Sequence, residues 1–148
     1  YFFKEVAGSG HMMRNFLRGN ELTEQLVGWL GEQVRDPNPK RVDLATVGLY
    51  HAASYWVRID ESNSTAKVSA EIKDNNNVAI TTEGVRKLTV FLDPDLIDVD
   101  APVTINVGGI ELYKGVVKSS LEAVTESWSA DLDPHLTYTH KVELDLVQ

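Results

Sequence analysis

Apolar and polar residues alternate along the chain from Lys67 to Lys118, in short runs that are separated by turn residues. The apolar members of these runs are Val68, Ala70 and Ile72, then Val78 and Ile80, then Leu88, Val90 and Leu92, and then Val103, Ile105 and Val107. A period of two places one set of side chains on one face of a pleated strand. Several short strands at close spacing predict a mostly β protein, here an antiparallel β-sandwich of about seven or eight strands, or else a barrel.

Three polar or glycine-containing stretches interrupt this alternation. They are Asp74-Asn75-Asn76-Asn77, Glu83-Gly84 and Gly108-Gly109. Asn and Gly adopt the positive φ angles that tight hairpin turns require. We therefore expect each stretch to end one short strand and to begin the next.

Further elements flank this region. Val42 to Thr46 and Tyr55 to Asp60 are predicted strands, and Ser120 to Trp128 has the apolar spacing of a short helix. The last strand is marked by Val142, Leu144 and Leu146, which alternate with Lys141, Glu143 and Asp145. Because Val90, Ile105 and Leu144 lie in the middle of alternating runs, we predict that all three are buried.

The first forty residues follow a different pattern. Tyr1 to Ala7 is predicted to be a strand, and Asn20 to Arg35 has the apolar spacing of a helix, with Asn20 as its N-cap. Pro37 and Pro39 then stop the helix. We therefore predict two domains, residues 1–38 and residues 39–148.

Composition removes several classes of function. The formal net charge is −8, whereas nucleic acids and anionic membrane surfaces attract clustered Lys and Arg. The longest apolar runs are much shorter than the ~20 residues that span a bilayer. The chain has no cysteine, which excludes disulfides, thiolate metal sites and cysteine nucleophiles. We expect no nucleic-acid partner and no membrane partner.

The strongest candidate for chemistry is His11, which follows Gly8-Ser9-Gly10. A catalytic histidine needs a loop at the end of a strand so that its imidazole can reach a nucleophile elsewhere. The same residues, followed by Met12, are also typical of a cloning remnant. The sequence alone leaves both interpretations open, although Tyr1 to Val6 resembles no common tag. Since Tyr1 is not a methionine, we infer that it is not the natural start of the protein.

Other polar clusters have simpler explanations. The loop Asp93 to Asp100 carries four aspartates that could bind calcium, but it lacks the glycine and the final glutamate of an EF-hand loop. We expect a solvated turn with Leu96 and Ile97 packed beneath it, and we expect no resident metal and no cofactor. The histidines His51, His135 and His140 lack the spacing of a metal site.

The remaining candidates are aromatic or acidic. The aromatic residues Tyr55, Trp56, Trp128 and Tyr138 could form a sugar-stacking platform, but aromatic residues on strands more often pack in a core or between domains. The acidic residues Asp43, Glu71, Glu83 and Glu111 offer no pair of fixed separation, so we do not propose a glycosidase.

The order of the N-terminal elements resembles the C-terminal end of certain bacterial α/β-hydrolases. These are esterases and prolyl-oligopeptidase-like peptidases that carry an extra β-sandwich after the hydrolase domain. The segments that carry the resemblance are Gly8-Ser9-Gly10-His11, the helix, Arg35 to Val42, Tyr55-Trp56-Val57, Thr82 to Val85, Leu96 to Val103 and Asn106 to Gly109. The resemblance implies that His11 is the general base of a serine hydrolase and that residues 1–38 hold the last strand, the histidine loop and the helix of the hydrolase domain.

The chain departs from that family in what it lacks. It contains no Gly-x-Ser-x-Gly nucleophile elbow, and the family's triad acid would precede the histidine. The resemblance therefore implies a C-terminal fragment that is inactive alone, whose partner is the rest of the parent hydrolase. The alternative is a non-catalytic β-sandwich module for binding or association. A homo-oligomer and a secreted or periplasmic parent are compatible with either reading, and the sequence fixes neither compartment nor substrate.

Overall fold

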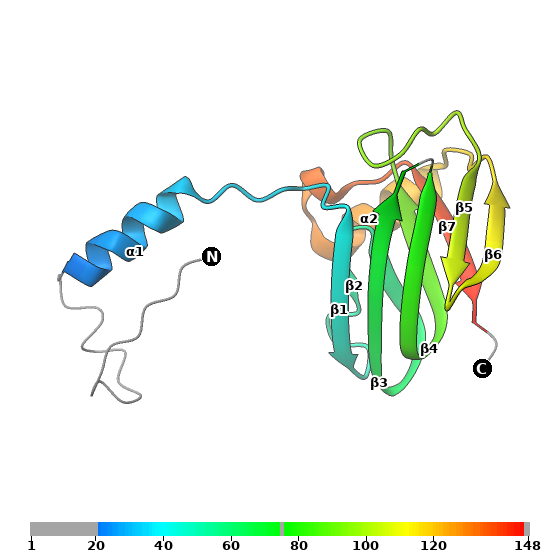
Figure 1. Ribbon diagram of the computed structural model, residues 1–148, viewed down its shortest axis with the longest axis horizontal. Helices are drawn as coiled ribbons and strands as arrows, with labels where there is room; N and C mark the ends of the chain where they lie inside the picture. Colours follow the sequence, from blue (N-terminus) through cyan, green and yellow to red (C-terminus); the bar gives the residue numbers. More distant parts are fainter. Residues whose placement is uncertain (1–20, 75, 147–148) are drawn as a thin grey trace. The chain divides into compact units, whose positions relative to one another are not determined.

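The computed structural model describes residues 21–74 and 76–146 and is mostly β (Figure 1). The chain divides into two compact units, residues 1–36 and 37–148, close to the boundary predicted after residue 38. In the first unit the described element is the helix α1 (Glu21–Glu32), which lies within the predicted helical range. The predicted strand Tyr1 to Ala7, the loop with His11 and the cap Asn20 lie outside the described residues.

The second unit contains seven strands and a helix. In chain order they are β1 (Arg41–Val47), β2 (Ala53–Ser54), β3 (Val57–Lys73), β4 (Asn77–Leu92), β5 (Val103–Val107), β6 (Ile110–Gly115), α2 (Leu121–Asp131), a 3₁₀ turn (Pro134–Leu136) and β7 (His140–Asp145). The predicted strand from Tyr55 begins later, at Val57, because Tyr55 has a positive φ of 49° and lies in a turn.

The unit is organised around the hairpin of β3 and β4, which is much longer than the short strands expected. The turn at Asn76 forms as predicted, with a φ of 55°. The expected break at Glu83-Gly84 is wrong, because β4 continues through it. Gly84 has a φ of 68°, and a Cβ atom there would lie 2.3 Å from the carbonyl oxygen of Thr65. Glycine at this position allows the hairpin to bend where the register between β3 and β4 is irregular, and the strand continues.

The two halves of the hairpin have different neighbours. The half next to the turn is flanked by β1 on one side and by β5 and then β6 on the other. The other half is flanked by β2 and β7. In Figure 1, β1, the turn half, β5 and β6 lie at the front, and β2, β7 and α2 lie behind. Each half of one continuous hairpin is therefore paired with its own set of strands.

The sheet is mixed, so the predicted antiparallel pairing holds for every pair of described strands except β4 and β5. Strand β5 runs parallel to the first half of β4, with Val78 opposite Ile105. The cause is the bend, which returns the end of β4 to the level of the β3–β4 turn. The loop after β4 lies against that turn, where the Asn76 side chain donates a hydrogen bond of 2.6 Å to the carbonyl of Asp98. Strand β5 therefore starts beside the start of β4 and runs in the same direction.

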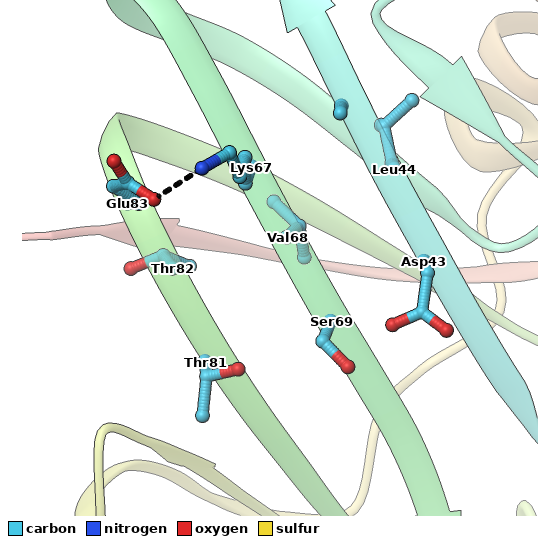
Figure 2. Close-up of a pocket in the computed structure, with 9 residues that line it drawn as sticks. Asp43, Leu44, Lys67, Val68, Ser69, Thr81, Thr82 and Glu83 are labelled. Carbon is cyan, nitrogen blue, oxygen red and sulfur yellow. Dashed lines mark hydrogen bonds and ion pairs between the residues drawn. The ribbon is translucent and has the colours of Figure 1, made fainter.

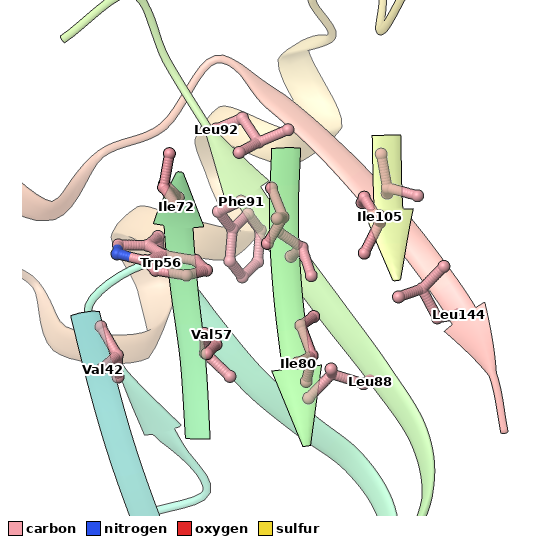
Figure 3. Packing of buried hydrophobic residues seen from close by; sticks show 14 of the residues in the cluster. Val42, Trp56, Val57, Ile72, Ile80, Leu88, Phe91, Leu92, Ile105 and Leu144 are labelled. Carbon is pink, nitrogen blue, oxygen red and sulfur yellow. The ribbon is translucent and has the colours of Figure 1, made fainter. Parts of the chain in front are cut away.

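One hydrophobic core joins both halves of the hairpin (Figure 3). The three residues predicted to be buried are confirmed, since Val90 and Ile105 are 0% exposed and Leu144 is 4% exposed. Further core residues are Val42, Val57, Ile59, Val68, Ala70, Ile72, Val78, Ile80, Leu88, Leu92, Val103 and Val142. The alternation read from the sequence therefore identifies the inward face of every long strand.

Helix α2 forms where the sequence predicts a short helix. Ser120 is its N-cap, and its hydroxyl accepts a hydrogen bond of 3.1 Å from the backbone N–H of Ala123. The helix lies over the outward face of the second half of β4, where Thr89 and Phe91 are almost fully buried. Both faces of β4 are covered here, so the whole run Leu88 to Leu92 is buried and does not alternate.

Candidate functional site

A shallow pocket of about 470 Å³ lies on the outward face of β1, β3 and β4 (Figure 2). The strand register sets Asp43, Ser69 and Thr81 in one row across the three strands. In the next row Lys67 forms an ion pair of 2.8 Å with Glu83, and both side chains are more than half exposed. The pocket offers hydroxyl and carboxylate groups to solvent, although most of its lining surface is apolar.

The acidic residues of this face are paired with cations and not with one another. Asp43 accepts a hydrogen bond of 3.1 Å from Nε of Arg41, which lowers the pKa of its carboxyl group. Glu71 lies 3.6 Å from Lys73. General acid and base catalysis by a carboxyl pair requires two carboxyl groups that share a substrate. The contacts of these acids therefore give no support to glycosidase chemistry.

A second cluster of charges lies between α2 and the sheet and was not anticipated from the sequence. Arg58 on β3 binds Asp60 at 2.7 Å and Glu126 of α2 at 2.8 Å. Lys141 on β7 binds the same Glu126 at 2.9 Å and Glu143 at 2.8 Å. The Arg58 guanidinium also lies 5.1 Å from the ring centroid of Phe91. We call these residues the α2 clamp, because they fasten the helix to β3 and β7.

The pKa values in the α2 clamp are shifted toward the charged forms. Burial raises the pKa of Glu126, but hydrogen bonds from Lys141 and Arg58 outweigh burial and the net pKa is lowered. Burial likewise lowers the pKa of Lys141, while its hydrogen bonds to Glu143, Glu126 and Glu122 produce a net increase. Each charge is compensated inside the cluster, so the clamp is an element of stability and does not offer a proton donor or acceptor near neutral pH.

The acidic loop Asp93 to Asp100 is a turn whose polar groups form hydrogen bonds within the protein. Asp93 accepts hydrogen bonds from the backbone of Asp95 and Leu96, and Leu96 is 2% exposed. The Lys40 ammonium donates to the backbone carbonyl of Leu96. The expected solvated turn with Leu96 and Ile97 packed beneath it is confirmed, since Ile97 is also buried.

Among the described residues, no three His, Asp or Glu side chains are arranged to hold a metal ion. The candidate histidines lie apart in the fold. His51 and His135 are exposed, whereas His140 is buried with its Nδ1 2.8 Å from the hydroxyl of Thr139.

The aromatic residues pack in the core and do not form a platform. Trp56 and Tyr138 are almost fully buried, and Tyr138 stacks on Phe91 with ring centroids 6.0 Å apart. Trp128 is half exposed on α2. The expectation of core packing is confirmed for Trp56 and Tyr138.

A further opening lies between β6 and the end of β7, and we call it the edge cleft. Its volume is about 560 Å³. It is lined by Thr81, Thr82, Gly84, Val85, Val107, Gly108, Ile110, Leu112, Asp145 and Leu146. Val85 forms its buried floor, while Ile110 and Leu112 are 67% and 42% exposed. The edge cleft is therefore an apolar recess with exposed apolar side chains on one wall and the carboxylate of Asp145 on the other.

Strand β6 forms the outer wall of the edge cleft and is an edge of the sheet. Among the described strands it is paired with β5 alone. Ile110 is opposite Val107 and Tyr113 is opposite Ile105, with a register shift between them. Since paired residues point to the same face, the shift turns both Ile110 and Tyr113 inward. The sequence identified the hairpin at Gly108-Gly109 but did not indicate that β6 would be left at an edge.

His11, the residue assigned to catalysis by resemblance, lies outside the described residues. Comparisons with protein-family models, curated proteins and solved structures gave no match to this chain. No helix among the residues described here is both long and apolar enough to span a membrane. Two features of the described residues are the candidates for a binding site. They are the edge cleft and the pocket on the outward face of β1, β3 and β4.

Proposed function

We propose that residues 37–148 form a β-sandwich accessory module that acts in binding or association and is not catalytic by itself. The observation that carries this proposal is the single core built by both halves of the β3–β4 hairpin. The compact unit begins at Pro37, so the module includes the proline-containing segment that precedes β1. The edge cleft supports a role in binding, because the exposed side chains of Ile110 and Leu112 lie beside a recess that a partner could fill.

The module is proposed to follow a serine hydrolase domain, of which α1 is the last helix. Support comes from the apolar side chains of α1. Val27 is 62% exposed and Leu30 is 53% exposed, although both lie within the helix. An amphipathic helix normally buries such residues against a neighbouring element. In this proposal the neighbour is the parent domain, and His11 is its general base by resemblance.

The module is tested by expressing residues 37–148 alone and recording circular dichroism with a thermal melt. We expect a β-type spectrum and one cooperative transition, as for other small domains. A helical spectrum or a gradual, non-cooperative change would overturn the module.

The hydrolase assignment is tested in the parent protein with a p-nitrophenyl ester. His11→Ala should lower kcat by several orders of magnitude, about as much as removal of the serine, because the two act as one unit. The KM should change little, since the imidazole contributes mainly in the transition state. His135→Ala is the matched control, because His135 is an exposed histidine of the sheet module. A kcat for His11→Ala within about tenfold of wild type would remove His11 from the mechanism.

A further inference from the structure

We propose that the edge cleft binds an extended polypeptide strand, which pairs with the free edge of β6 and inserts alternate apolar side chains into the cleft. This inference deepens the proposed binding role of the module and rests on it. Two features of β6 define the occupant. They are the backbone groups on its outer side and the apolar recess beneath it.

The outer edge of β6 is suited to pairing with the backbone of another strand. Among the described strands β6 pairs with β5 alone, so the N–H and C=O groups on its other side have no strand partner there. An edge of this kind is a template for a further strand, and main-chain hydrogen bonds then supply the affinity. A small apolar molecule would fill the recess but would leave these groups without a partner.

The cleft selects the side chains of that strand. In an extended segment every second side chain points to the same face. The side chains on one face of the bound strand would enter the recess between Ile110, Leu112 and Val85, where they would cover apolar surface. The 67% exposure of Ile110 and the 42% exposure of Leu112 are the surfaces that such a strand would bury.

The charged residues beside β6 predict where charged residues lie along the partner strand. Glu111 is exposed on β6, and Asp145 lines the cleft together with Ile110, so two carboxylates lie toward the same end of the strand. Lys114 is exposed toward the other end. The complementary strand carries a basic residue near Ile110 and an acidic residue near Lys114. Strand partners with opposite charges are favoured over those with like charges.

The experiment selects peptides of about ten residues, a length typical of long strands, from a displayed random library on the full 148-residue chain. The best binder is synthesised, and its Kd is measured by calorimetry for the wild-type chain and for two variants. Leu112→Lys places a charge in the cleft wall. Leu121→Lys is the matched control, because Leu121 is 77% exposed on α2, away from the cleft. Hydrogen exchange of the β6 amides and a thermal melt are recorded on the same samples.

We expect binders with apolar residues at alternate positions whose affinity falls at least about tenfold with Leu112→Lys and is unchanged with Leu121→Lys. N-methylation of alternate peptide amides should abolish binding, and the peptide should slow exchange of β6 amides. The proposal is overturned if no peptide is enriched. It is also overturned if neither Leu112→Lys nor N-methylation changes the Kd of the selected peptides.

Two further outcomes also decide against it. Protection of β6 amides that rises with protein concentration, without peptide, would identify a second copy of the chain as the occupant. A chain that melts cooperatively but selects no alternating peptide would refute the strand site and leave the module intact. A chain without a cooperative melt would refute the module and this inference together.

Discussion

The indole Nε1 of Trp56 donates a hydrogen bond of 2.7 Å to the backbone carbonyl of Pro39, and Trp56 is 0% exposed. The bond ties the proline-rich segment to the sheet. Lys40 adds to it, because its carbonyl accepts a hydrogen bond of 2.7 Å from the backbone of Ile72. The segment that the sequence marks as a junction is therefore part of the second unit from Pro37 onward.

Removing the junction segment should destabilise the sheet unit. A chain of residues 41–148 lacks the Pro39 carbonyl, so the buried Trp56 N–H loses its acceptor. We expect a free energy of unfolding about 1–3 kcal/mol below that of residues 37–148, measured by urea denaturation. Lys40→Ala in the longer chain is the control that isolates the contribution of the Lys40 side chain. Equal urea midpoints for the two lengths would show that the Trp56–Pro39 bond contributes nothing.

Truncation of the core should be costly in both halves of the fold, and Ile105 on β5 and Leu144 on β7 test one half each. Ile105→Ala and Leu144→Ala should each lower the free energy of unfolding by about 2–5 kcal/mol, because each leaves a cavity in a fully packed site. Ile110→Ala is the matched control, since Ile110 is 67% exposed and should change stability by no more than about 0.5 kcal/mol. Similar costs at Ile105 and Ile110 would contradict the assignment of faces.

Gly84 should tolerate alanine less well than Gly108 does. Both have a positive φ, 68° and 59°, so alanine is strained at either position by about 1–2 kcal/mol. A Cβ atom at Gly84 would also lie 2.3 Å from the Thr65 carbonyl oxygen, whereas Gly108 has no neighbour within 4 Å of that position. We expect Gly84→Ala to cost more than Gly108→Ala in urea denaturation. Equal losses would show that the close approach at Thr65 relaxes freely.

Acid should weaken the α2 clamp. The pKa of Glu126 is lowered from 4.5 in the folded state, so its contribution to stability is present above pH 4.5 and is lost as the pH falls through the lowered value. Glu126→Gln should therefore reduce the loss of stability between about pH 5 and pH 3. Glu83→Gln is the control, because the Glu83–Lys67 pair is exposed and contributes little. An unchanged pH dependence in Glu126→Gln would remove the clamp as a source of acid sensitivity.

The sequence by itself determined the local features of this protein. Alternation over a few residues identified the inward positions Val90, Ile105 and Leu144, since the side of a strand on which a residue lies depends only on its parity. The turn at the glycine pair 108–109 and the short helix near Ser120 were predicted for the same reason, because turn preferences and helical spacing belong to a few neighbouring residues.

Only the tertiary structure decided how the strands are joined. A glycine that ends a strand and one that bends it have the same local preference, and at Gly84 the position of Thr65 makes the difference. The same bend sets β5 parallel to β4 and leaves β6 at an edge. Arg58 and Glu126 are 68 residues apart, and no local pattern in the sequence connects them. Their contact forms only when α2 packs on the sheet, because burial and pairing depend on what covers a face and not on the residues within it.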